Sequence, residues 1–342
     1  MRILYGVQGT GHGHISRAKV ILPLLREVAD VDVLISGYNF NLELDGAIAY
    51  KSRGISLSYD NKGAIDILET ALALKPVKFI QDVQGIPTKE YDFVISDFEP
   101  VSAWAAQWAG VPCVGLSHQA AFLSNQVPRP PKKSLMAEGV LKHFAPCDLA
   151  IGTHYKRYDH FIEPPILRKS IKQLHPRTGE HVTIYLPAFD HETLVTLFNK
   201  IPDVKWEIFS PTCQSRYVRF NVTVNPVGND PFLKSFEHSI GLVCSAGFEA
   251  PSEAMYLGKK LLVIPIKNQY EQICNAVALE KLGAKAIFDI KPDFVSKIRS
   301  WIDKGNIIHL DEVCDEELLI SKILKMGMSE TQAISLSDNF HG

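Results

Sequence analysis

The chain has 342 residues, of which 46% are hydrophobic and 22% charged, and its formal net charge is −2. This length suits two domains of ordinary size better than one core. So small a net charge gives no field that would recruit nucleic acid or an acidic membrane. No apolar run approaches the ~18 residues of a membrane span, and the N-terminus lacks the apolar segment of a signal peptide. We therefore expect a cytoplasmic globular protein with no nucleic-acid partner and no transmembrane segment.

The first half alternates short apolar runs with helical patterns, which is typical of a parallel α/β sheet. Helices are predicted over residues 15–28 and 100–108, and the Pro-rich, basic stretch 125–135 is predicted to be a loop. Residues 154–180 contain Pro-Pro and are expected to connect two domains. The predicted strands are Ile3–Val7, Val31–Ser36, Phe93–Ser96, Cys113–Leu116 and Leu149–Gly152.

A glycine–histidine loop, GVQGTGHGHISRA, follows the first strand and opens the first helix. Its glycines permit tight turns and close approach of a ligand. A dinucleotide fingerprint fits poorly, because the third glycine is missing and Ser36-Gly37-Tyr38 stands where an acid is expected. Histidine is poised to act as a base near neutral pH. His12 and His14 are both candidates, and a structural turn with two surface histidines is the alternative.

Two polar side chains follow later strands of the same predicted sheet. Asp97 ends the strand in FVISDFEP, where it could orient a histidine base or cap the helix near Pro100. His118 follows the next strand, in GLSHQAAF, and is either a second candidate for the base or a helix-start histidine. The carboxyl ends of parallel strands are where such sheets bind ligands.

The α/β pattern restarts after the connection. Helices are predicted over residues 191–200, 248–257, 270–282 and 316–325, with Asp190 as an N-cap. The predicted strands are His181–Leu186, Val204–Phe209, Val222–Val227, Gly241–Cys244 and Leu261–Pro265.

Residues 244–276, CSAGFEAPSEAMYLGKKLLVIPIKNQYEQICNA, combine a turn, a helix, a strand and a second helix. The turn at Ser245–Gly247 offers backbone N–H groups at a helix start, where the dipole favours an anion. Glu253, about two turns into that helix, can accept hydrogen bonds from ribose hydroxyls. Glu271 and Gln272 offer an acceptor pair and an amide for a sugar. The alternative is an ordinary βαβ unit with structural glycine and glutamates.

This stretch resembles the donor-binding half of GT-B glycosyltransferases, both the UDP-glycosyltransferases and the N-acetylglucosaminyltransferase that makes the peptidoglycan lipid intermediate. The matching features are Gly247, Ser252-Glu253, Leu261–Pro265, Glu271-Gln272 and Asn275-Ala276. The glycine–histidine loop is similar to Gly-Thr-Gly-Gly-His of the peptidoglycan enzyme, with one residue more. His14 is the better match, because it immediately precedes the helix.

The resemblance implies a GT-B fold of two Rossmann-like α/β domains facing across a cleft. We place them at residues 1–165, on the acceptor side, and 166–325, on the donor side, with a tail of residues 326–342 that either packs back on the first domain or is loose. The implied catalytic residues are His14, Asp97 and His118, although the peptidoglycan enzyme has Glu where His118 stands. The implied donor-binding residues are Gly11, Gly13, Ser245, Ala246, Gly247, Phe248, Glu249, Glu253, Glu271 and Gln272.

The implied activity is inverting, metal-independent transfer of a hexose-type sugar from a nucleotide-diphosphate sugar, with UDP favoured, to an acceptor hydroxyl. The peptidoglycan enzyme's Gly-rich phosphate loop is absent from Tyr185–Glu192, so phosphate contact should fall on Ala246–Phe248. The acceptor expected by resemblance is lipid-linked or a cell-envelope saccharide, which leaves room for peripheral membrane contact.

We expect no metal and no cofactor besides the donor substrate. The six cysteines show neither CxxC nor Cys/His spacing, and Asp30-Val31-Asp32, a metal-like triplet, starts a strand away from the ligand edge. Two other functions remain open. A hydrolysing nucleotide-sugar epimerase would recruit carboxylates such as Glu99 and Glu249, and a non-catalytic sensor would bind a sugar nucleotide without turnover.

Overall fold

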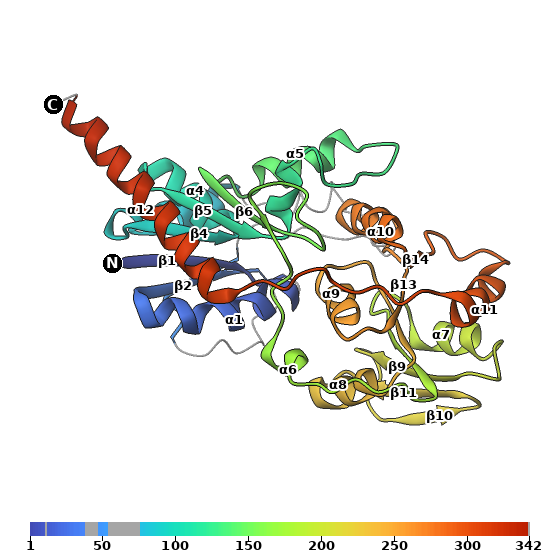
Figure 1. The fold of residues 1–342 in the computed structure, drawn as a ribbon. Coiled ribbons are helices and arrows are strands. Elements are labelled where there is room, and N and C mark those ends of the chain that lie inside the picture. The colour runs from blue at the N-terminus through green and yellow to red at the C-terminus, as the bar shows by residue number, and fades with distance from the viewer. Residues whose placement is uncertain (11, 38–46, 54–75, 341–342) are drawn as a thin grey trace.

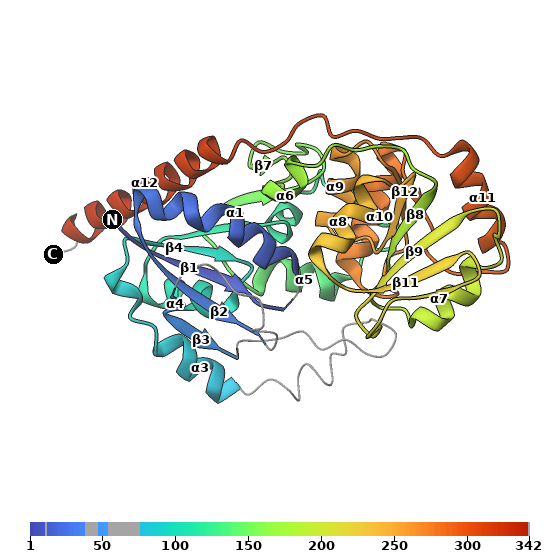
Figure 2. The ribbon, with the colours of Figure 1, turned by 90° about the horizontal axis from the view of Figure 1, so that it is seen from below.

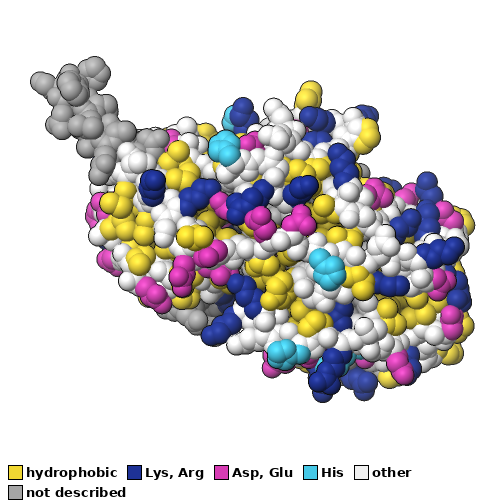
Figure 3. Space-filling view, viewed as in Figure 1, with side chains coloured by type: hydrophobic (Ala, Val, Ile, Leu, Met, Phe, Trp, Pro, Cys, Tyr) yellow, Lys and Arg dark blue, Asp and Glu magenta, His cyan; other side chains and the backbone are white. Residues whose placement is uncertain are grey.

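The computed structural model describes the chain except residues 11, 38–46, 54–75 and 341–342. Two parallel-type sheets lie side by side, each flanked by helices (Figures 1 and 2). The two-domain α/β architecture expected from the sequence is confirmed. Lys and Arg side chains are interspersed with Asp and Glu over both halves on the face seen in Figure 3, in keeping with the small net charge.

The first sheet has the strand order β3-β2-β1-β4-β5-β6-β7, and its described pairs are all parallel. Strands 3-2-1-4-5-6 are the order of a doubly wound sheet, whose direction of winding reverses between β1 and β4. Its strands are β1 (Arg2–Gln8), β2 (Asp30–Ser36), β3 (Tyr50–Ser52), β4 (Phe93–Asp97), β5 (Cys113–Ser117), β6 (Leu149–Thr153) and β7 (Ile162–Glu163).

Helices cover both faces of this sheet because its strands are apolar on both sides. On one face, Ile15, Ile21 and Leu25 of α1 pack against buried side chains of β1 and β2. On the other, Val101 and Ala105 of α4 pack against Leu4 and Val94. The helices of this half are α1 (His12–Val28), α3 (Pro76–Gln84), η1 (Thr88–Glu90), α4 (Pro100–Ala109), η2 (Gln119–Leu123) and α5 (Leu135–His143).

The second sheet repeats this winding. Its order is β10-β11-β9-β8-β12-β13-β14, and only β10 is antiparallel among its described pairs. Without β10 the order is again that of a doubly wound sheet, which reverses between β8 and β12. Its strands are β8 (His181–Tyr185), β9 (Lys205–Ser210), β10 (Tyr217–Arg219), β11 (Val222–Pro226), β12 (Gly241–Cys244), β13 (Lys260–Val263) and β14 (Lys285–Ala286).

Two buried clusters cover the faces of the second sheet, one around Trp206, Phe198 and Trp301, the other around Phe236, Met255 and Leu279. Asp190 caps α7 as expected, because its side chain accepts from the Thr193 N–H at 3.2 Å. The helices are α6 (Lys169–Lys172), α7 (His191–Phe198), α8 (Asn229–Glu237), α9 (Glu249–Tyr256), α10 (Tyr270–Leu282) and α11 (Phe294–Lys304).

The last helix, α12 (Glu316–Phe340), returns to the first half of the molecule (Figures 1 and 2). Leu319, Ile320 and Ile323 are buried in the same cluster as α1 and β1. Residues 316–325, which the sequence analysis placed with the second domain, therefore pack on the first. The connection over residues 154–180 also differs from the expectation, since β7 joins the first sheet and α6 forms a short turn of helix.

The two sheets share one consequence for function. A doubly wound sheet leaves a crevice where its winding reverses, at the carboxyl ends of the two central strands. In the first sheet those strands are β1, which leads into the glycine–histidine loop, and β4, which ends at Asp97. In the second they are β8 and β12, and β12 leads into the turn at 245–248. The loops that follow β1, β8 and β12 line one shared cavity.

Candidate functional site

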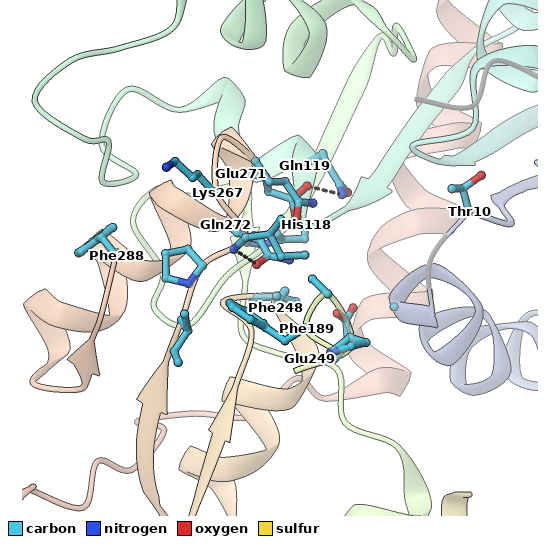
Figure 4. A pocket seen from close by; sticks show the side chains of 18 of the residues that line it. Thr10, His118, Gln119, Phe189, Phe248, Glu249, Lys267, Glu271, Gln272 and Phe288 are labelled. Atoms are coloured by element: carbon cyan, nitrogen blue, oxygen red, sulfur yellow. Dashed lines mark hydrogen bonds between the residues drawn. The ribbon is translucent and has the colours of Figure 1, made fainter. Parts of the chain in front are cut away.

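A cavity of about 890 Å³ lies between the two halves and is lined by the loops that follow β1, β5, β8, β12, β13 and β14. Its volume falls in the range of small-molecule and cofactor sites. The lining residues are Thr10, Gly13, His14, Arg17, His118, Gln119, Pro187, Ala188, Phe189, Gly247, Phe248, Glu249, Ile264, Pro265, Ile266, Lys267, Gln269, Glu271, Gln272, Phe288, Asp289 and Ile290. Figure 4 shows many of these side chains around the cavity.

His14 and Asp97 form a pair on the first-domain wall. His14 stands in the first turn of α1 and Asp97 at the end of β4, and Nδ1 of His14 lies 2.7 Å from Oδ1 of Asp97. Because an ionised carboxylate only accepts, Nδ1 donates this bond, and Nε2 is the nitrogen left for the cavity. Burial raises the pKa of Asp97, but the nearby Arg17 and His14 outweigh it and hold that pKa below its ordinary value.

Arg17 completes this cluster and was missed by the sequence analysis. Its Nε and Nη2 donate to the two carboxylate oxygens of Asp97, each at 2.8 Å, and only 4% of its side chain is exposed. Arg17 follows His14 by three residues, so both side chains leave the same face of the helix. That spacing was the signal in the sequence that could have identified it.

His118 lies in the same cavity but has no nitrogen to spare. Nδ1 is 2.8 Å from the Thr153 carbonyl oxygen, and Nε2 is 2.8 Å from Oδ1 of Asn275. Its ring stacks on Phe248, with centroids 4.1 Å apart and planes 9° apart. His118 therefore joins the two domains, since Asn275 and Phe248 belong to the second, and this geometry does not offer it as a base.

The donor-side residues divide into two groups. Gly247, Phe248, Glu249, Glu271 and Gln272 line the cavity, whereas Ser245 and Ala246 are not part of its lining. The turn is held in place from the first domain, because the Tyr155 hydroxyl donates to the Gly247 carbonyl at 2.9 Å.

Glu271 and Gln272 are both fixed by hydrogen bonds. The amide of Gln119 donates to Glu271 Oε2 at 3.0 Å, from across the domain boundary (Figure 4). Gln272 Oε1 accepts from the Ile266 N–H at 3.0 Å. Among the described residues, the amide nitrogen of Gln272 and the second oxygen of Glu271 have no hydrogen-bond partner.

Gly13 shows why the glycine loop needs its small residues. A Cβ built on Gly13 would lie 2.5 Å from Oε2 of Glu249, so any side chain would displace that carboxylate. Gly11 lies outside the described residues, and the structure describes the backbone of His12 only.

Glu253 does not stand where its expected role requires. Its carboxylate is buried outside the cavity lining and pairs with Arg168, which donates to both oxygens at 2.7 and 2.9 Å. Both carboxylate oxygens are therefore already hydrogen-bonded inside the protein. This geometry does not support the expected ribose contact.

The structure also shows where other carboxylates lie. The N-cap of α4 is Glu99 rather than Asp97, because Glu99 accepts from the N–H groups of Val101 and Ser102 at 2.8 and 2.6 Å. Glu99 is fully buried and so cannot reach a sugar. Asp32, at the opposite end of its strand from the cavity, is bound by Arg2 and Tyr91.

Within the described ranges, no three His, Cys, Asp or Glu side chains gather in a way that could hold a metal ion. In the same part of the chain, no helix has the length and apolar character needed to cross a membrane.

Comparison with protein families matches residues 1–302 to glycosyl transferase family 1. The chain belongs to this family. A search of curated protein sequences finds no match. The expected resemblance to GT-B glycosyltransferases is therefore confirmed, and so is the expectation of an enzyme that transfers a glycosyl group.

Solved structures of low sequence identity share the fold of this glycosyltransferase over almost its whole length. Glycosyltransferase SnogD from Streptomyces nogalater is 15% identical, with a TM-score of 0.54 and coverage of 98% of this chain and 99% of that one. MurG of Acinetobacter baumannii is 14% identical, with a TM-score of 0.54 and coverage of 97% of this chain and 94% of that one. UGT2 of Phytolacca americana, complexed with UDP-2fluoro-glucose and pterostilbene, is 12% identical. Its TM-score is 0.58, and the match covers 99% of this chain and 99% of that one.

Proposed function

We propose that this glycosyltransferase is an inverting, metal-independent enzyme that moves a hexose-type sugar from a UDP-sugar to an acceptor hydroxyl, with His14 as the base. The observation that carries the proposal is the His14–Asp97 pair. Nε2 of His14, the ring nitrogen that is not bonded to Asp97, belongs to a residue that lines the same cavity as the turn at Gly247–Glu249 of the other domain.

The geometry supports a single displacement. Nε2 of His14 takes the proton of the acceptor hydroxyl, whose oxygen attacks the anomeric carbon as the bond to the diphosphate breaks. Asp97 holds the ring in the required tautomer through Nδ1 and stabilises the imidazolium that forms. In the proposed reaction the acceptor oxygen attacks the anomeric carbon from the face opposite the leaving diphosphate, which inverts that centre.

The leaving diphosphate is placed at the start of α9. Backbone N–H groups after Gly247 and the helix dipole favour an anion there without a metal ion. Open space around Gly247, where a Cβ would meet no atom within 4 Å, leaves room for phosphate oxygens. Glu271 and Gln272 bind the hydroxyls of the transferred sugar.

Support for UDP comes from the fold neighbour from Phytolacca americana, whose structure holds UDP-2fluoro-glucose. The acceptor is assigned only as a hydroxyl compound, with a lipid-linked or cell-envelope saccharide as the class to try first.

The test is incubation with radiolabelled UDP-, TDP- and GDP-sugars, with and without a mixture of saccharide and lipid-linked acceptors. We expect transfer to an acceptor, or slow release of free sugar with inverted configuration, from a UDP-sugar. An epimerised sugar would instead identify an epimerase, and binding without turnover of any donor would identify a sensor. Either outcome overturns the proposal.

A further inference from the structure

The His14–Asp97 pair differs from a simple histidine–carboxylate pair, because a permanent cation shares the carboxylate. Arg17 donates to both oxygens of Asp97, and its Nη2 lies 3.2 Å from Nδ1 of His14. A positive charge so close disfavours a proton on His14. The charges of Asp97 and Arg17 cancel, so these two residues alone would do little to stabilise a protonated His14 ring.

A second carboxylate restores the negative charge, and it comes from the other domain. Oε1 of Glu249, the first residue of α9, lies 3.5 Å from Nη1 of Arg17. The same carboxylate packs over Gly13, the residue before His14. Two carboxylates and one guanidinium leave one unbalanced negative charge next to His14, which a proton on the ring would neutralise.

The other titratable neighbour in the described part of the chain does not change this balance. The phenol of Tyr5 lies beside Asp97 and Arg17, and burial raises the pKa of Tyr5 well above its ordinary value. Tyr5 therefore stays neutral, and the charges that face His14 are those of Asp97, Arg17 and Glu249.

We propose that Glu249 is a positioning residue that sets the basicity of His14 from across the cleft, by balancing the charge of Arg17. This rests on the proposed role of His14 as the base. Because Glu249 stands on the second domain, the base reaches full strength only when the donor-binding domain is seated against α1, so a displaced domain leaves His14 a weaker base.

The test substitutes Glu249→Gln, which keeps the shape of the side chain and removes its charge. Glu207→Gln is the matched control, because it is the same substitution in the same domain. The Glu207 side chain is 31% exposed and that of Glu249 is 32% exposed, but Glu207 lies outside the cavity lining. Histidine NMR, with the His14 resonance assigned from His14→Gln, gives the titration midpoint of the ring in the unliganded protein and needs no substrate.

We expect Glu249→Gln to lower the midpoint of His14 by about 0.5–1 pH unit, and Glu207→Gln to leave it unchanged. In wild-type protein the acidic limb of the pH–rate profile should follow the same midpoint. In Glu249→Gln this limb should shift to lower pH, and the rate should level off at a lower maximum, because the base is weaker. Arg17→Met, if it folds, should shift the midpoint in the opposite direction.

An unchanged His14 midpoint in Glu249→Gln, or an equal shift in Glu207→Gln, overturns this inference, whatever the activity. If the midpoint shifts as expected but no nucleotide sugar is turned over by wild-type protein, the electrostatic role of Glu249 stands and the proposed function fails.

Discussion

Arg168 and Glu253 form a two-bond ion pair between the connection that joins the domains and helix α9, with N–O distances of 2.7 and 2.9 Å. Only 5% of the Glu253 side chain is exposed, against 27% for Arg168. The pair therefore ties the donor-side helix to the start of the second domain. It also explains why a glutamate that matches a sugar-nucleotide motif is directed away from the cavity.

This pair predicts that Glu253→Gln acts on stability rather than on binding. Loss of the carboxylate leaves a half-buried guanidinium without its charge partner, which should lower the free energy of unfolding by about 2 kcal/mol. Urea denaturation measures this loss of stability. Calorimetry with UDP should show an affinity within about twofold of wild type. If Glu253 did bind the ribose, losing that charged hydrogen bond would lower the UDP affinity by about tenfold or more. If Glu253→Gln instead keeps wild-type stability and binds UDP much more weakly, Glu253 contacts the ribose and the prediction is wrong.

His14→Ala should lower turnover by about 10²–10⁴-fold, the range expected for a positioned base. Donor affinity should change little, because the residues proposed to bind the donor sugar, Glu271 and Gln272, stand on the second domain. Asp97→Asn should also lower turnover, and the double variant should lose little more than His14→Ala, since the two residues act as one unit. Steady-state kinetics and donor titration measure both quantities.

His12→Ala is the control for the register of the loop. An active His14→Ala protein together with an inactive His12→Ala protein would move the base by two residues. His118→Ala is expected to reduce stability, because His118 bonds to Thr153 and Asn275 and stacks on Phe248.

Glu271→Ala and Gln272→Ala should separate the sugar from the nucleotide. Both residues line the cavity, and we expect each substitution to weaken binding of the intact UDP-sugar by about tenfold, the loss of one good hydrogen bond, while UDP binds as before. Gln119→Leu should have a smaller effect of the same kind, because Gln119 holds Glu271 from the first domain. An equal loss for UDP and UDP-sugar would place the pair against the nucleotide.

The stability contributed by Asp97 should depend on pH with a definite sign. Its folded pKa lies below the ordinary value of 3.8, so the folded state binds fewer protons than the unfolded chain between those two values. The contribution is full above pH 3.8 and is lost as the pH falls through the folded pKa. Wild-type protein should therefore exceed Asp97→Asn in unfolding free energy by a constant amount at neutral pH, and by a shrinking amount below pH 3.8. A difference that stays constant down to pH 2 would contradict this.

Activity should survive EDTA. In this mechanism the N–H groups at the start of α9 meet the charge of the leaving diphosphate. Assays in excess EDTA should match those of untreated enzyme. Abolition by EDTA with recovery in Mg²⁺ or Mn²⁺ would show that a metal ion takes part.

Local patterns were enough to predict most elements of both sheets. Strand β12 (Gly241–Cys244) and helix α10 (Tyr270–Leu282) have the predicted bounds, because an apolar run between polar residues and a helix ended by a glycine are encoded within a few residues. The short β3, β7, β10 and β14 were missed, since two or three residues carry too little pattern to be recognised.

The loops of the site were also predictable from the sequence, because ligand loops follow the carboxyl ends of parallel strands and the strands themselves were visible. His14 and Asp97 were paired from the resemblance to UDP-glycosyltransferases, and the structure places them in contact. Their separate roles stay predictions.

What only the tertiary structure decided is which charges meet. Arg17 reaches Asp97 across 80 residues of sequence, and Arg168 reaches Glu253 across 85. The return of α12 to the first domain is of the same kind. The spacing of His14 and Arg17 puts both side chains on one face of α1, but it does not identify the carboxylate that Arg17 meets, because that partner is set only when distant strands and helices pack. The sequence therefore determined the elements and the position of the site, and long-range packing determined the electrostatics within it.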